Sequence, residues 1–389
     1  MGLLDQLLDP GFRQAASVLV EVGQSKSELG DLAMLISEIE VQVGRVEAAS
    51  ATITIDDRRD TDGTWMASDS GLFARWEPIV ISADFQTHIE EVFRGYITEL
   101  KPTFPQNGGE AKLVVTCQDS SVALSREHMR RVWGDEDTPI SDRDILIELL
   151  SPLPLSASSG PDGQSSRALS QDGTPIVFLK ERAKANGFEL IFNGENVYFG
   201  PMQLEGEPQS TIMVYAGSAT NCLNFSVTDD AQKADSVVYE LAPREEGDEP
   251  VVNEVGPDLP LLAAEPAAAE GSGLGTPSVA RIKGEGDETE EEVAARAVGV
   301  ANENSFRVKA SGELDGALYG HVLRVGKLVK VDGVGTRNGG IYYVDSVAHK
   351  FTQDGYRQNF QLIRNGVGET DALGTPPLSN VISAISSLF

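Results

Sequence analysis

The chain has 389 residues, of which 40% are hydrophobic, and a formal net charge of −29. Contacts with phosphates and with anionic lipids need clustered Lys and Arg, so this balance argues against nucleic-acid binding and membrane docking through basic patches. The hydrophobic content suffices for cores in two or three domains. The excess acid fits either an ordinary soluble protein or a surface that repels a passing polyanion.

Residues 1–17 are expected to form an N-terminal docking segment. Four leucines lie within residues 3–8, interrupted by Asp5, and Pro10 and Gly11 end the run. No basic region precedes the leucines, so the segment does not have the pattern of a signal peptide. No apolar run reaches transmembrane length, so we expect no membrane anchor.

Residues 18–130 predict a first tube-like β-barrel domain. Apolar and polar residues alternate at 51–56, and β-branched runs at 79–82, 92–98 and 113–117 indicate further strands. This pattern is typical of an antiparallel, barrel-like domain. Cys117 and Cys222 lie far apart in apolar runs and without metal-site spacing, which favours buried, reduced thiols.

Residues 131–215 predict a small α+β domain. Ser141 and Asp144 have the spacing of a capping box before an apolar helical pattern. Thr174 followed by Pro175 starts a second helix, which Gly187 ends. Runs at 188–192 and 197–199 then predict a hairpin around a central Asn-Gly.

Residues 216–242 and 287–366 predict a second tube-like β-barrel domain. Thr289 and Glu292 indicate a capping box and a helix. The predicted strands are 223–228, 237–241, 306–310, 322–325, 328–331, 341–347 and 356–363. The order barrel, inserted module, barrel is a weak internal duplication of architecture.

Two segments remain. Residues 243–286 are rich in Glu, Pro, Ala and Gly, which predicts a flexible insertion, either a plain linker or an exposed partner-binding arm. Residues 367–389 form an apolar tail with one stripe at helical spacing. This stripe either packs on its own domain or makes a trimer or spike contact; its residues are Leu378, Val381, Ile382, Ile385, Leu388 and Phe389.

No motif selects a catalytic residue, a cofactor-binding residue or a metal ligand, so we expect no cofactor and no enzyme. The glycines around Gly333 are followed by a strand pattern, whereas a dinucleotide site needs a helix there. The four histidines lack zinc-helix spacing, and His349 fits a buried strand residue. A cell-wall hydrolase carried in a particle would need two converging carboxylates. A secreted adhesin would need a signal peptide and surface aromatics.

Three stretches resemble the phage late control protein D family, the baseplate hub proteins of contractile tails. The first covers 93–100 and 113–120, and the second covers 173–188 and 197–199. The third is the most specific and covers 326–335, 340–349, 355–356 and 362–365. It begins with a strand and a glycine turn, continues with a strand of the pattern GxYxV that reaches His349, and ends at Arg364-Asn365.

The resemblance implies two tail-tube-like β-barrels per chain and a smaller α+β domain between them. It also implies a homotrimer that adapts a six-fold tail tube to a three-fold central spike. Expected partners are the tail tube protein above, a separate spike protein below, and baseplate wedge or other tail proteins. Hub proteins of this family enclose an axial channel, so DNA or protein cargo would pass through it without specific binding. The expected location is the virion tail baseplate or an injection particle, assembled in the host cytoplasm.

Overall fold

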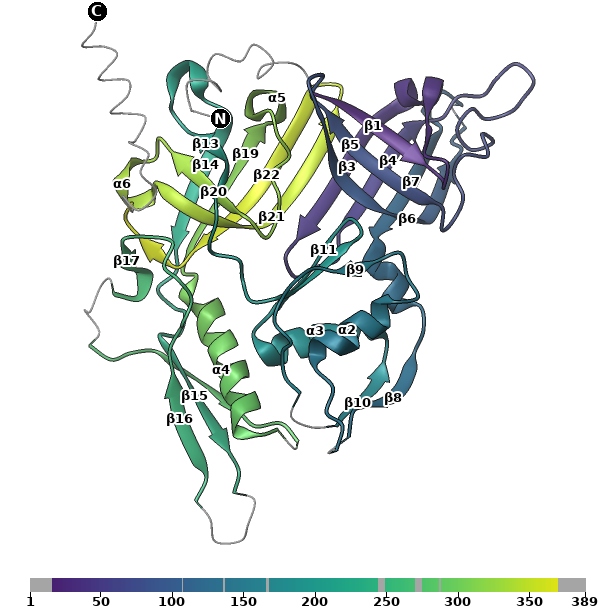
Figure 1. Cartoon of the computed structure of the whole chain (residues 1–389). Coiled ribbons are helices and arrows are strands. Elements are labelled where there is room, and N and C mark those ends of the chain that lie inside the picture. Colours follow the sequence, from purple (N-terminus) through teal and green to yellow (C-terminus); the bar gives the residue numbers. More distant parts are fainter. Residues whose placement is uncertain are drawn as a thin grey trace, which may run out of the picture.

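The structure is a computed structural model that describes residues 16–106, 108–135, 137–165, 168–243, 249–269, 275–286 and 288–369. As predicted, the chain is mainly β with an inserted α+β part. One continuous sheet of 13 strands runs across the molecule, and the longer helices lie on one side of it (Figure 1). No helix in these ranges is long and apolar enough to cross a membrane.

The first strand set is antiparallel, in the order β3-β4-β7-β6-β5-β1-β2. Alternate residues such as Ile39, Ile53 and Cys117 are fully buried, which is why the period-two pattern was readable. The elements are β1 (Ser17–Val22), β2 (Ser27–Glu28), η2 (Gly30–Leu35), β3 (Ile36–Gly44), β4 (Ser50–Asp56), β5 (Pro78–Asp84), β6 (Ile89–Thr103), η3 (Gly108–Glu110), β7 (Lys112–Asp119) and η4 (Ser120–Ser125).

The α+β module packs two helices against short strands. Its elements are β8 (Met129–Trp133), α2 (Asp142–Leu150), β9 (Ser156–Ala157), β10 (Leu169–Gly173), α3 (Pro175–Asn186), β11 (Glu189–Asn193) and β12 (Asn196–Gly200). The backbone N–H of Asp144 donates to Ser141 Oγ at 3.0 Å, so the predicted N-cap is present. Gly187 ends α3 with φ 65°, in the left-handed region.

The second strand set contains β13 (Gln209–Met213), η5 (Gly217–Ala219), β14 (Cys222–Asp229), β19 (Val308–Asp315), α5 (Gly316–Tyr319), β20 (Leu328–Asp332), α6 (Gly335–Asn338), β21 (Gly340–Thr352) and β22 (Gly355–Arg364). Residues 209–213 lie within the range predicted for the α+β domain, 131–215, but they form β13, which pairs with β20 of the second strand set, so that boundary is wrong. A parallel pairing across more than a hundred residues leaves no local sequence pattern.

The predicted strand at 322–325 is wrong, because these residues form a loop. Their backbone N–H groups donate to side chains instead of to a neighbouring strand: Val322 N to Glu90 at 2.9 Å, Leu323 N to Gln358 at 2.8 Å, and Arg324 N to Gln209 at 2.8 Å. The segment is apolar because it is buried, and burial alone does not distinguish a strand from a well-bonded loop.

The two strand sets are joined through β21. Its first half pairs with β20, from Gly340 to Tyr343, and its second half pairs with β3, from Ser346 to Thr352. Between the halves the register against β22 shifts at Asp345, which marks a β-bulge. The predicted barrels are therefore two parts of one sheet that meet at this bulge.

The prediction of a flexible insertion at 243–286 is wrong for its described residues. They contain strands that pair on both sides of β15, which was itself predicted in the second barrel, and α4 covers this small sheet. These strands are short and largely exposed, so the sequence shows no clear alternation of apolar and polar residues among the many Glu, Pro and Ala residues. The elements are β15 (Ser236–Leu241), β16 (Val251–Val255), β17 (Glu265–Pro266), η6 (Ala267–Ala269), β18 (Val279–Lys283), α4 (Glu290–Ser305) and β23 (Gly366–Val367).

Candidate assembly surface

The open face of the sheet is polar across eight strands. Its residues are traced by direct pairing from strand to strand, while most of their neighbours in sequence point into the core. In strand order they are Asn224, Ser226 and Thr228; Lys309, Ser311, Glu313 and Asp315; Arg357, Asn359, Gln361 and the buried Ile363; Ser346, Ala348, Lys350 and Thr352; Glu38, Glu40, Gln42 and Gly44; Ser50, Thr52, Thr54 and Asp56; Lys112, Val114, Thr116 and Gln118; and Tyr96, Glu99, Lys101 and Thr103.

This open face is nearly neutral. It carries five basic and six acidic side chains, a net charge of −1 against −29 for the whole chain. Several charges pair within it: Lys350 Nζ lies 2.5 Å from a Glu38 carboxylate oxygen, and Arg357 contacts Asp315. This face is therefore not the acidic, polyanion-repelling surface that the overall composition suggested as one interpretation.

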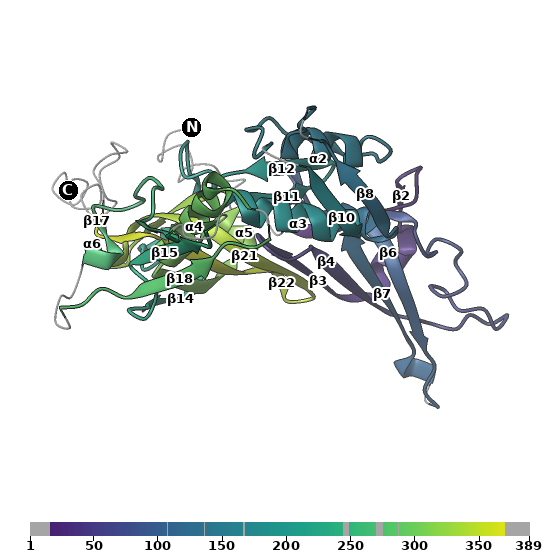
Figure 2. The same cartoon turned by 90° about the horizontal axis from the view of Figure 1, so that it is seen from below.

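The sheet has exposed ends and edges that suit subunit contacts. β14 pairs with β19 alone, which leaves its other edge without a strand among the described residues. Leu223 on β14 is 52% exposed, and Phe104, in the β6–β7 hairpin, is 51% exposed. Figure 2 shows this hairpin projecting beyond the rest of the sheet. Open edges and exposed large apolar side chains are features that partner chains cover.

Arg45 fixes the place where the two strand sets meet. It follows the last residue of β3 and donates through Nε to Asp345 in the bulge, at 3.0 Å. Its Nη1 also donates to Glu303 of α4 at 2.6 Å and to Glu189 of β11 at 3.3 Å. One guanidinium therefore ties together both strand sets, the α+β module and α4.

Glu189 is the buried member of this cluster, with a side chain 3% exposed. Tyr343 donates its hydroxyl to Glu189 at 2.6 Å. Burial raises the pKa of Glu189 to about 7, although Arg45 and the Tyr343 hydrogen bond act in the opposite direction. The carboxyl group therefore titrates near neutrality at the junction of the modules.

The residues singled out from the sequence fall into three groups. The tail stripe, Leu378 to Phe389, lies outside the described residues, as do residues 1–15 of the docking segment. His349 is buried and bonded to Tyr356 at 2.8 Å, and burial, with a smaller contribution from Arg324, lowers its pKa to about 3. Both cysteines are free and buried, as predicted, and burial raises the pKa of Cys117 to about 12.

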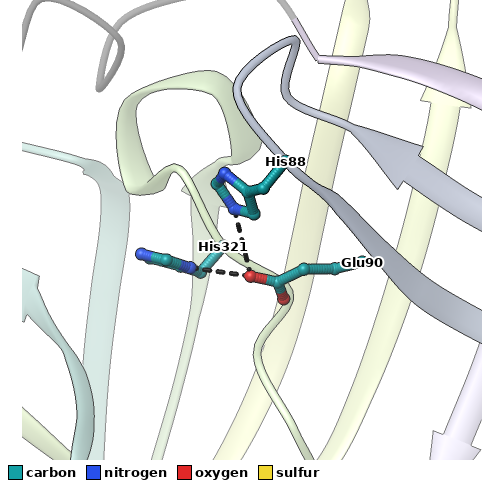
Figure 3. A group of neighbouring side chains, drawn as sticks. All are labelled: His88, Glu90 and His321. Carbon is teal, nitrogen blue, oxygen red and sulfur yellow. Dashed lines mark hydrogen bonds and ion pairs between the residues drawn. The ribbon is translucent and has the colours of Figure 1, made fainter.

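Sequence reasoning missed one cluster. His88 and His321 are 233 positions apart, yet both face Glu90 in the structure (Figure 3). No local spacing links the three, because the sheet brings the first and second strand sets together.

This architecture is shared with proteins of phage tails and type VI secretion. A 43 kDa tail protein of prophage MuSo2 from Shewanella oneidensis superposes with a TM-score of 0.65 at 12% identity, over 90% of this chain and 99% of that one. A tail protein of Neisseria meningitidis MC58 gives a TM-score of 0.61 at 13% identity, over 91% and 98%. The c3393 protein of E. coli, a type VI secretion component, gives 0.53 at 12%, over 85% and 73%.

The chain thus has a phage tail protein fold, and the predicted resemblance to baseplate hub proteins is confirmed at the level of the fold. No curated protein sequence matches it significantly. The chain belongs to the family described as the Alg8 N-terminal domain, whose family model matches residues 15–353.

Proposed function

We propose that this chain is a structural baseplate hub protein of a contractile phage tail or related injection system. Three copies form a ring that adapts the six-fold tail tube to the three-fold central spike. The observation that carries the proposal is the pair of strand sets joined in one sheet with a continuous polar open face. Three such chains supply six strand sets, so one ring matches six-fold symmetry on one side and three-fold symmetry on the other.

In this proposal the open face lines the channel. Hydroxyl and amide side chains, with paired charges, present a surface that neither attracts nor strongly repels a polyanion. DNA or protein cargo then passes without specific binding. The β14 edge and the exposed Leu223 lie between subunits, where a partner covers them.

The role is non-enzymatic in this proposal. The alternative of a particle-associated cell-wall hydrolase requires an acid with a raised pKa that reaches substrate. Glu189 has the raised pKa, but Arg45 and Tyr343 hold it and its side chain is 3% exposed. A buried carboxyl group with these two partners is better placed to hold the modules together than to act as a general acid. Zymography of the purified chain on peptidoglycan tests this directly, and a clearing band would support the hydrolase.

The partners and location follow from the same role. The tube protein lies above the ring, a separate spike protein below it, and wedge or other tail proteins around it, in a virion baseplate or injection particle assembled in the host cytoplasm. The apolar stripe from Leu378 to Phe389 is proposed to contact the neighbouring subunit or the spike. Deleting 374–389 tests this contact: spike capture unchanged by the deletion would exclude the spike role.

Mass photometry of the purified chain tests the central claim. A species at three times the mass of one chain is expected, with little monomer. Leu223→Lys places a charge in the proposed subunit contact and should shift the distribution towards monomer, whereas Val177→Lys, at an exposed site on α3, serves as the control. A wild-type chain that remains a monomer at micromolar concentration would overturn the trimer.

A further inference from the structure

The cluster of His88, Glu90 and His321 joins two distant parts of the fold (Figure 3). His88 lies in the turn between β5 and β6, Glu90 lies on β6, and His321 lies in the loop after α5. Glu90 Oε1 is 2.7 Å from His321 Nδ1 and 3.2 Å from His88 Nε2. All three candidate ligand atoms lie within 4.8 Å of one another.

The supporting contacts orient these atoms toward a common point. His88 Nδ1 lies 3.0 Å from Thr87 Oγ1, which leaves Nε2 to face the cluster. That Nε2 atom is buried, and its contact with Glu90 is an ion pair by distance that lacks hydrogen-bond geometry. Glu90 Oε2 accepts from Val322 N at 2.9 Å and lies 3.6 Å from Arg324 Nη2, so Oε1 is the oxygen left for the histidines. Outer contacts of this kind orient ligands in metal sites.

The dimensions suit a small divalent transition metal. Zinc bonds to imidazole nitrogen and carboxylate oxygen are about 2.0–2.2 Å long, so neighbouring ligands of a tetrahedral ion lie about 3.3 Å apart. The His88–Glu90 separation already matches this value, and the His321–Glu90 separation needs to open by about half an ångström. The two histidine nitrogens lie within 4.8 Å of each other, which a small side-chain rotation can adjust. Two imidazoles and one carboxylate form a donor set that zinc binds well.

We propose that His88, Glu90 and His321 bind one zinc ion or a similar divalent transition-metal ion, with the fourth coordination position open to solvent. The histidine side chains are 38% and 39% exposed, which gives the ion a route in. Bound there, the cation links the β5–β6 turn of the first strand set to the α5–β20 loop of the second. It acts as a second tie between the two halves of the sheet, distinct from the β21 junction.

Zinc titration of the purified full-length chain, stripped of metal with a chelator, tests the site. One zinc per chain is expected, measured by competition with a chromophoric zinc indicator. His88→Ala and His321→Ala should each weaken zinc binding at least tenfold, because removing only an outer partner of a metal ligand already costs about 10–100-fold. X-ray absorption of the zinc complex should show imidazole scattering from two ligands.

The matched control is His128→Ala. His128 pairs with one carboxylate, Asp172, at 2.7 Å, but has no second histidine beside it, so zinc affinity should not change. His88→Asn and His321→Asn, checked by circular dichroism, separate loss of a ligand from loss of fold. The proposal is overturned if wild-type chain binds zinc no more tightly than the His88→Asn/His321→Asn double variant, or if the zinc complex lacks imidazole scattering.

Discussion

Replacing Arg45 with Met should destabilise the chain by an amount that depends on pH. In the wild type, Glu189 is buried with a pKa near 7, and Arg45 is its cationic partner. Without Arg45 the Glu189 carboxylate is a buried, unpaired charge, which it avoids by taking up a proton. The loss of folding free energy therefore cannot exceed the cost of protonating Glu189 at the pH of the experiment. That cost is about 1.4 kcal/mol for each pH unit above the pKa of 7, hence about 2 kcal/mol at pH 8.5.

The hydrogen bonds to Asp345 and Glu303 add about 1 kcal/mol at any pH, since both acceptors are partly exposed. We therefore expect a total loss of about 3 kcal/mol at pH 8.5. At pH 5.5, where Glu189 is already protonated in the folded wild type, the expected loss is about 1 kcal/mol. The sign of the effect follows from the pKa of Glu189, which in the folded chain lies above its ordinary value of 4.5. Ionisation of Glu189 therefore opposes folding, and Arg45 offsets part of that cost.

Urea unfolding followed by circular dichroism at both pH values measures these losses. Lys112→Met is the matched control: its ion pair with Asp56 is 3.7 Å long and both side chains are about half exposed, so less than about 1 kcal/mol is expected at either pH. An equal loss for the Arg45 variant at pH 5.5 and pH 8.5 would refute the assignment of Glu189 as its titrating partner.

Three further predictions concern stability. His349→Gln should make the free energy of unfolding less dependent on pH in the acid range. The pKa of His349 is about 3 in the folded chain and 6.5 ordinarily, so this residue alone lowers wild-type stability by about 2–3 kcal/mol from pH 6 to pH 4. Urea midpoints measured across this range test the prediction. Gly299→Ala should cost about 1–3 kcal/mol, since its Cβ would lie 2.6 Å from Gly187 Cα across the α3–α4 contact, whereas Gly173→Ala has open space and should be nearly neutral in thermal unfolding. Thr289→Ala removes the capping box of α4 and should cost about 0.5–2 kcal/mol, read as reduced hydrogen-exchange protection in the first turn.

The parts of the fold that were predictable are those with local signals. Period-two alternation located β4 and β7, and the capping residue Thr289 located the start of α4. The parts that were missed depend on distant partners. β13 pairs with β20 across the whole insertion. The backbone N–H groups of the loop at 322–325 donate to side chains far away in the sequence, among them Glu90 of the first strand set. The His88–Glu90–His321 cluster was missed for the same reason.

Overall charge and local charge lead to different conclusions about a passing polyanion. A net charge of −29 suggests a repelling surface, but the open face carries only −1, because its basic residues lie opposite acidic ones on neighbouring strands. Repulsion over a Debye length of about 8 Å depends on the charges that line a channel, not on those on the outer surface. In the proposed channel lined by this face, low net charge and hydroxyl groups would therefore allow passage, because nearly all of the acidic excess belongs to residues outside this face.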